Sequence, residues 1–427
     1  MRMTLPDTEI LTALVGRVFH VEGITLGDQQ RVLVRYHGHL LVEDSAMAYD
    51  QLAEALRPYG ITPLFRVEQG QQVVVLVPSP ATPRRLNIWV NVILFALTFL
   101  SVWLTGALDA QAEALRQIYG NDIPQGVLFR EALLHPWGGL PFTLTLMGIL
   151  LGHELGHYFA TRLHRGDATL PYFLPLPLIS PLGTMGAVIL TRRPPKNKRV
   201  LLDIGLAGPL TGFLLALPLL FYGLAHSPVK TLEDTLYTRQ ADSLPNCPTS
   251  ALPGETYSCP NDDLLEGNSL LYLAAKYLVK GEWLPAPPQY AQSPWRYWLR
   301  YWLTGHPVPL GGRDVYLHPI AWAAWAGLLV TFLNLIPVGQ LDGGHILYAL
   351  LGRKSAVFWR LILVALLLLG FLWSGWWLWA IIIFFFGQAQ AEPLDQITPL
   401  DGRRRVLAVT ALILFLLLLT PVPLLTF

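Results

Sequence analysis

The feature that most constrains this chain is a nearly uncharged apolar segment, Leu140 to His164, which carries His153, Glu154 and His157 near its far end. A run of this length can cross a bilayer as one helix. Ionisable side chains at the centre of a membrane cost about 3 kcal/mol each, so three of them so close together need a shared partner. The segment therefore predicts a metal site inside a membrane helix.

The spacing of the three residues favours a particular chemistry. His153 and His157 are four residues apart and share one face of a helix, so both imidazoles can reach one ion. Glu154 lies one step round the helix, where it can touch water bound to that ion. Two histidine ligands and a carboxylate base are the zincin arrangement. The alternative, histidines that are only satisfied polar residues in a bundle, leaves three costly groups without a common partner.

The composition indicates a polytopic α-helical membrane protein. Only 14% of the 427 residues are charged, there are 14 Trp, and the mean hydropathy is +0.43. The net charge of +1 gives no reason to expect a nucleic-acid partner. The N-terminal stretch contains acidic residues and no long apolar run, so it does not resemble a secretory signal and we expect it to stay in the cytosol.

Residues 1–80 are predicted to form a small soluble cytosolic α/β module. After a first helix, Asp7 to His20, the expected order is β-α-β-β, with an extended run in Arg31 to Val42, a helix from Ser45 to Pro58, and alternation from Thr62 to Val77. The module contains no nucleotide loop or metal spacing. Docking of a cytosolic regulator and a passive cap both remain open. Residues 81–86 form a linker to a membrane-embedded domain, residues 87–427.

Hydropathy predicts about seven transmembrane helices and one re-entrant hairpin. The expected spans are about Asn87 to Ala107, Leu140 to His164, Val200 to Leu224, Pro319 to Leu335, two within Ala356 to Gly387, and Val406 to Leu425. Between the second and third spans, Thr169 to Thr191 is apolar but rich in proline, so it cannot be an ordinary spanning helix. Irregular backbone at this depth must face protein or a water-filled cavity, so we expect this segment to line the cavity at the metal.

The distribution of basic residues gives the predicted orientation. With a cytosolic N-terminus, the clusters Arg84-Arg85, Arg192 to Arg199, Arg353-Lys354 and Arg403 to Arg405 all fall inside. The metal site then lies toward the cytosolic end of its helix. A long loop, residues 226–317, falls outside and holds both cysteines, Cys247 and Cys259, whose pairing the sequence leaves undecided.

A catalytic zinc site normally has three protein ligands, and Asp342 is the predicted third one. By the expected topology it lies level with the two histidines. Pro337, Gly339, Gly343 and Gly344 should break the helix around it and bring the carboxylate inward. His345 is a rival ligand.

Two motifs resemble those of the site-2 protease family of intramembrane zinc metalloproteases (peptidase family M50). H-E-x-x-H stands at residues 153–157, and N-x-x-P-x-x-x-x-D-G at residues 334–343, in the order of that family. The segment Pro181 to Ala187 is similar to the family's membrane hairpin, and Ala207-Gly208-Pro209 to its third core helix. With Thr169 to Phe173, these features resemble the EGY-like subgroup of bacteria and plastids. The resemblance covers roughly residues 138–355.

The resemblance and the residue chemistry together give a set of expected roles. One Zn²⁺ per chain is expected on His153, His157 and Asp342, with Glu154 as general base, Asn334 bonding the substrate backbone or oxyanion, and Gly183, Thr184 and Gly186 presenting backbone to an extended substrate. The resemblance implies a transmembrane protein substrate, cut within the lipid bilayer in regulated intramembrane proteolysis.

Two other functions are weighed against the protease. A catalytically silent membrane scaffold would have no need of Glu154. A metal transporter would be expected to carry several polar stations or a His-rich loop, whereas the sequence shows one constellation. We expect a multi-pass protein of a cell inner (plasma) membrane, because no transit peptide is visible ahead of the N-terminal module.

Overall fold

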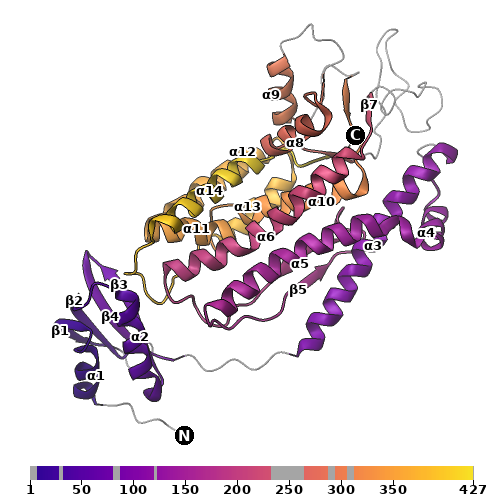
Figure 1. Cartoon of the computed structure of the whole chain (residues 1–427). Helices are drawn as coiled ribbons and strands as arrows, with labels where there is room; N and C mark the ends of the chain where they lie inside the picture. The colour runs from indigo at the N-terminus through magenta and orange to yellow at the C-terminus, as the bar shows by residue number, and fades with distance from the viewer. Residues whose placement is uncertain are drawn as a thin grey trace.

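The computed structural model describes residues 7–27, 32–79, 87–119, 123–231, 264–286, 294–304 and 312–426. The predicted linker and both cysteines lie outside these ranges. A bundle of roughly aligned helices forms most of the molecule, and a small sheet with two helices stands at one end of it (Figure 1). Short strands and two helices lie at the opposite end.

The N-terminal part is a four-stranded antiparallel sheet with two helices. The elements are α1 (Thr8–Val15), β1 (Phe19–Leu26), β2 (Val34–Leu40), α2 (Ser45–Leu56), the 3₁₀ turn η1 (Arg57–Tyr59), β3 (Ile61–Glu68) and β4 (Gln71–Pro78), with strand order β1-β2-β4-β3. Tyr36, Leu52 and Phe65 are buried in its core. The strand β1 was not predicted, because most of its side chains are exposed and show no apolar alternation. The predicted first helix is accordingly shorter.

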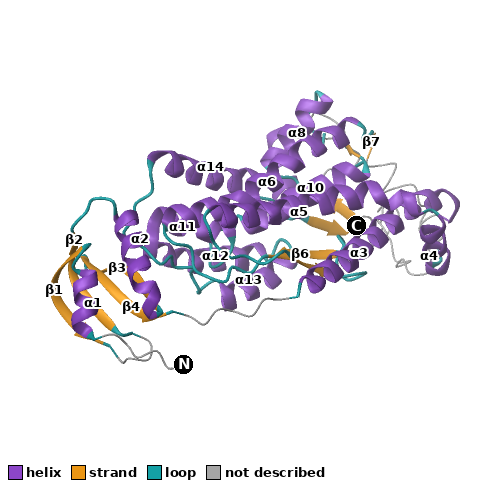
Figure 2. Cartoon of the chain, turned by 60° about the horizontal axis from the view of Figure 1, so that its bottom comes forward, coloured by secondary structure: helices purple, strands orange, loops and turns teal. Residues whose placement is uncertain are grey.

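Three helices form the centre of the bundle: α5 (Leu140–Leu163), α6 (Lys198–Ala225) and α10 (Pro319–Asn334). They lie side by side in Figure 2. Glycines permit their close approach, since a methyl group at Gly156 would lie 2.5 Å from the carbonyl oxygen of Ala207, and one at Gly223 would lie 2.4 Å from the nitrogen of Ala321. Small residues at such contacts are typical of packed membrane helices.

Further helices lie on either side of this centre, and those on the first side differ from the prediction. The helix α3 (Ile88–Tyr119) continues well past Ala107, and α4 (Gln125–Leu134) with the 3₁₀ turn η2 (Pro136–Gly139) occupies the predicted loop. On the other side lie α11 (Asp342–Leu351), the 3₁₀ turn η4 (Gly352–Val357), α12 (Phe358–Leu369), α13 (Gly375–Phe386) and α14 (Gly402–Leu418).

The predicted count of seven spans is not confirmed. Among the described residues two helices, Ile88–Arg116 and Lys198–Ala225, are long and apolar enough to cross a membrane, and the pair of helical segments Gln125–Leu134 and Pro136–Leu163, bent by 87°, makes a third at most. The apolar run after Ala356 breaks between α12 and α13. Each of these helices has 12 residues, so it rises only about 18 Å against a hydrocarbon core of about 30 Å.

The proline-rich segment after α5 forms a hairpin of β5 (Tyr172–Pro175) and β6 (Thr184–Val188). Its backbone is bound to α3: Ser101 Oγ donates to the carbonyl oxygen of Gly183 at 2.5 Å, and Asn91 Nδ2 donates to that of Pro171 at 3.0 Å. Gly183 has a φ of 72°, a left-handed conformation that suits glycine. The irregular backbone is therefore satisfied by protein.

The end of the molecule away from the N-terminal sheet contains two short antiparallel pairs, β7 (Val229–Thr231) with β9 (Arg313–Val315) and β8 (Leu264–Glu266) with β10 (Leu424–Thr426). The helices α8 (Leu270–Lys280) and α9 (Pro294–Thr304) cover them. Lys276 is fully buried here and pairs with Asp314 at 3.0 Å.

Candidate metal centre

The two histidines of α5 point their outer nitrogens at each other. Nε2 of His153 and Nε2 of His157 lie 3.2 Å apart, and the side chains are mostly buried. One helical turn separates the residues, so the backbone alone places both rings on the same face of α5. The face points toward α6 and the end of α10.

Asp342 reaches the histidines from a break in the chain. The helix α10 ends at Asn334, and α11 begins at Asp342 itself. A methyl group at Gly343 would lie 2.0 Å from the carbonyl oxygen of Leu335, so only glycine permits the intervening loop to fold back this tightly. The predicted helix break is present, and it brings the carboxylate into the bundle.

The three ligand atoms have the separation that a tetrahedral ion requires. Oδ2 of Asp342 lies 3.3 Å from Nε2 of His153 and 3.2 Å from Nε2 of His157, which closes a triangle with the 3.2 Å between the histidines. Bonds of about 2.0–2.1 Å at a tetrahedral centre separate neighbouring ligand atoms by about 3.3–3.4 Å. Two nitrogens and one carboxylate oxygen therefore fit zinc and leave one position for water or substrate. Among the described residues no other group of three or more His, Cys, Asp or Glu side chains brings its ligand atoms together in this way.

A backbone carbonyl fixes the orientation of His157. Its Nδ1 lies 2.8 Å from the carbonyl oxygen of Ile204 in α6 and donates to it, which leaves the lone pair of Nε2 free for a metal. The ring lies against Gly208, where a methyl group would be 2.1 Å from Nε2. Gly208 belongs to the motif Ala207-Gly208-Pro209, but its contacts with His157 were not predicted from the sequence. Every residue has a backbone carbonyl, so the residue type of Ile204 does not indicate this role. Only the motif could have drawn attention to this part of α6.

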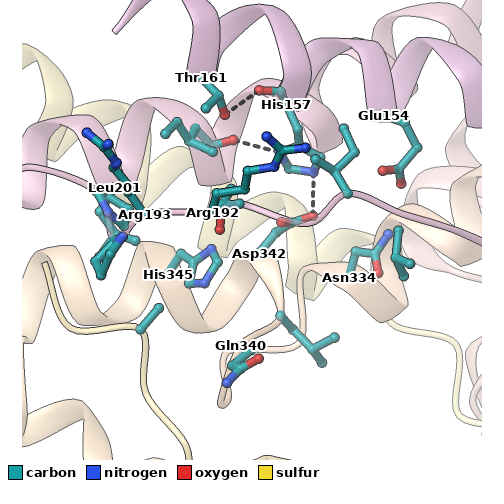
Figure 3. A pocket seen from close by; sticks show the side chains of 18 of the residues that line it. Glu154, His157, Thr161, Arg192, Arg193, Leu201, Asn334, Gln340, Asp342 and His345 are labelled. Atoms are coloured by element: carbon teal, nitrogen blue, oxygen red, sulfur yellow. Dashed lines mark hydrogen bonds and ion pairs between the residues drawn. The ribbon is translucent and has the colours of Figure 1, made fainter. Parts of the chain in front are cut away.

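Glu154 and Asn334 lie beside the three ligands. Glu154 is buried in the same pocket, and Nδ2 of Asn334 lies 3.3 Å from Nε2 of His153. Figure 3 shows Glu154 and Asn334 to one side of the pair formed by His157 and Asp342, and His345 to the other. His345, the rival ligand, lines the pocket but lies outside the group of three ligand atoms.

A cavity of about 780 Å³ opens at the three ligands. Its walls come from α5, α6, the α10–α11 break, the chain from Ala187 at the end of the hairpin to Pro195, and residues 390–392. The expected substrate-binding residues Gly183, Thr184 and Gly186 are not among its lining residues. Thr184 instead donates to the carbonyl oxygen of Leu174 at 2.9 Å within the hairpin, and the next part of β6, Ala187 and Val188, faces the cavity.

Comparison with known proteins places the chain in a family. Residues 141–285 and 312–370, which contain the histidines and Asp342, match peptidase family M50. This chain belongs to that family. In this M50 chain, the match includes the three ligand residues of α5 and α11, together with Ile204 of α6 and Asn334 of α10, which contact the histidines.

The curated relatives of this M50 chain include plant proteins. It is 29% identical over 294 residues to "Probable zinc metalloprotease EGY1, chloroplastic" of Arabidopsis thaliana, covering 68% of this chain and 44% of the relative. It is 28% identical over 287 residues to EGY2 of the same plant, covering 67% and 42%. The chain thus spans less than half the length of these relatives. No solved structure matched the chain.

Proposed function

We propose that this M50 chain is an intramembrane zinc metalloendopeptidase, which hydrolyses peptide bonds in or near the transmembrane segments of other proteins. The triangle of His153, His157 and Asp342, with edges of 3.2–3.3 Å, carries the proposal. Its position among apolar helices, and the zinc metalloproteases among its relatives, support it.

The side chains around the ligands are suited to amide hydrolysis. When bound, zinc polarises a peptide carbonyl and lowers the pKa of water to about 7. Glu154 takes a proton from the attacking water and gives it to the leaving amine. Asn334, whose amide lies 3.3 Å from the His153 ring, is placed to donate to the substrate carbonyl as negative charge develops on its oxygen.

The substrate must reach the metal as an extended chain, because a helical peptide bond is enclosed by its own hydrogen bonds. Among the described residues β6 pairs with β5 on one edge only. Ala187 and Val188, at the end of β6, line the catalytic cavity. A single-span substrate that unwinds near the metal therefore adds as a strand to the other edge of β6, which has no strand beside it among the described residues.

The orientation that we propose places the N-terminus and the open end of the cavity in the cytosol. Arg192 and Arg193 line the cavity, and Arg353 pairs with Glu392 of the cavity wall at 3.2 Å. Arg404, in the first turn of α14, pairs with Asp203 of α6 at 2.7 Å. A concentration of basic residues is the pattern of a cytosolic face. Cleavage there would release a cytosolic domain of the substrate, as in regulated intramembrane proteolysis. The compartment that we propose is a bacterial inner membrane.

Cleavage of a model single-span substrate by the purified chain tests the proposal. Wild type is compared with Glu154→Gln at matched zinc content, because the amide keeps the shape of the side chain but cannot accept the proton. We expect cleavage by wild type and a loss of at least about a hundredfold in the variant. Equal cleavage by both proteins would rule out Glu154 as the base.

A further inference from the structure

The segment between α13 and α14, residues 388–400, joins the catalytic cavity to the N-terminal sheet, and we call it the strap. Gln390, Ala391 and Glu392 line the cavity. A few residues on, the strap adds to the edge of β3: the nitrogen of Phe65 donates to the carbonyl oxygen of Leu394 at 3.0 Å, and the nitrogen of Gln396 donates to that of Phe65 at 3.0 Å. Figure 1 shows this segment meeting the N-terminal sheet at β3.

The strap also completes the apolar core of the N-terminal module, residues 7–79. Leu394 and Ile397 pack against the cluster that contains Phe65. At the edge of this contact the hydroxyls of Ser45 and Thr398 lie 2.8 Å apart, and both residues are buried. The module and the strap therefore share one interior.

The opposite edge of the strap binds the other wall of the cavity. The nitrogen of Leu394 donates to the carbonyl oxygen of Pro195 at 2.9 Å, and the nitrogen of Asp395 donates to that of Lys196 at 2.7 Å. Pro195 itself lines the cavity, and Lys196 forms an ion pair with Asp50 of α2. One extended segment thus connects β3 to the chain that leaves the hairpin.

Arg66 of β3 holds the strap by its side chain. Only 11% of this side chain is exposed, and its Nη1 donates to the carbonyl oxygens of Pro393 at 3.0 Å and Leu394 at 2.8 Å. Its Nε lies 4.0 Å from Glu392, which also accepts from Arg353 at 3.2 Å. Arg353 lies in η4, directly after the helix that begins with Asp342.

We propose that the N-terminal module is part of the proteolytic site, with Arg66 as a positioning residue that holds the wall formed by Gln390, Ala391 and Glu392 against the substrate path. The inference rests on the proposed protease function. The module contacts the strap in three ways: by backbone hydrogen bonds, by packing of Leu394 and Ile397, and by the approach of Arg66 to Glu392. A passive cap would have no need of all three contacts with a segment that lines the cavity. Arg66 acts through the strap and does not touch the metal ligands.

Thiol labelling tests the position of the wall without any need for catalysis. Ala391→Cys is introduced in full-length protein in which Cys247→Ser and Cys259→Ser remove the native thiols. Arg66→Ala is expected to raise the labelling rate of this cysteine by about fivefold or more, because two carbonyls lose their buried donor. Arg66→Lys, which keeps the charge and one donor group, should give an intermediate rate and guards against a module that fails to fold.

Arg35→Ala is the matched control, because Arg35 pairs with Glu68 at 3.2 Å inside the same sheet. It should leave the labelling rate unchanged. Equal labelling in Arg66→Ala and Arg35→Ala would overturn the inference, whether or not a cleavable substrate is known.

Kinetics then separate positioning from loss of structure. With the single-span substrate, Arg66→Ala should raise KM by about tenfold while zinc content and kcat per bound zinc stay within about twofold, since ground-state and transition-state binding weaken alike. A fall in zinc content and kcat with an unchanged KM would indicate a structural role only and would overturn the inference. If wild type itself cleaves nothing, the proposed function fails, and the labelling rates still decide the position of the wall.

Discussion

At the scale of single residues, the metal centre depends most unexpectedly on a residue without a side chain. A methyl group at Gly208 would lie 2.1 Å from Nε2 of His157 and 2.5 Å from two carbons of its ring. The change Gly208→Ala must therefore displace the ring or separate α5 from α6. We expect zinc content to fall from about one ion per chain to less than a tenth, since outer contacts alone alter metal affinity by about 10–100-fold.

Elemental analysis of the purified membrane protein measures this effect. Gly148→Ala, in the same helix as the histidines, is the control, because a methyl group there would meet no atom within 4 Å. It should keep its zinc and gain slightly in helix stability, as alanine is the better helix former. Full zinc content in Gly208→Ala would contradict the close fit seen between α6 and His157.

The residues of the candidate site could be predicted from the sequence to different degrees. His153 and His157 meet because of helix periodicity, which is a local property, so their pairing could be predicted. Asp342 was predicted from the breakers around it and from the family motif. The carbonyl oxygen of Ile204 could not be predicted, since every residue has one and only the packing of α6 on α5 selects it.

At the scale of helices and strands, hydropathy located the apolar segments but not where helices end. The helix α3 continues beyond its apolar part to Tyr119, because polar residues are as compatible with a helix as apolar ones. The predicted break within the apolar run from Ala356 to Gly387 is present, because α12 ends at Leu369 and α13 begins at Gly375. Ser374 and Gly375 mark that break in the sequence, but the resulting short helices do not support two full spans.

One element outside the helical bundle, β8, carries a carboxyl with a testable pH dependence. Glu266 is buried beside Asp314 and accepts from Tyr272 at 2.9 Å. Burial, and then the negative charge of Asp314, raise the pKa of Glu266 to about 7, although Lys276 opposes the shift and Tyr297 and Tyr301 of α9 also face this cluster. The folded state therefore holds this proton more tightly than the unfolded chain does.

The sign of the effect follows from proton binding. Between the ordinary glutamate pKa of about 4.3 and the raised value of about 7, the folded protein retains a proton that the unfolded chain releases, so stability falls as the pH rises. The change Glu266→Gln removes the ionisable group, so it should also remove this part of the fall in stability. We expect the thermal midpoint to drop more in wild type than in the variant between about pH 5 and pH 7.5.

Differential scanning fluorimetry in detergent at the two pH values provides the comparison. Glu282→Gln, which removes a partly exposed carboxylate that pairs with Arg313 at 2.6 Å, should follow wild type. Parallel pH curves for wild type and Glu266→Gln would mean that the buried carboxyl does not titrate in this range.

At the scale of the whole molecule, the unpredicted feature is how the N-terminal module meets the catalytic domain. Ser45 and Thr398 are 353 positions apart, and neither hydropathy nor turn chemistry relates them. The strap has no regular helix or strand of its own and no charge run. Its importance is visible only in three dimensions, where it contacts the sheet, the chain after the hairpin and η4 together.

This arrangement predicts that the module can be joined to the strap by a disulfide. The Oγ atoms of Ser45 and Thr398 lie 2.8 Å apart, so sulfurs in their places need only a small approach to reach the length of an S–S bond, about 2.05 Å. In protein carrying Cys247→Ser and Cys259→Ser, the pair Ser45→Cys and Thr398→Cys should therefore oxidise nearly completely under mild conditions.

With a protease site inserted between residues 81 and 86, the two fragments should stay together on a non-reducing gel and separate after reduction. Each single cysteine variant should separate in both conditions, and separation of the double variant before reduction would show that module and strap are not in contact. Because the closed loop would be very long, the disulfide should also raise the thermal midpoint of the intact protein.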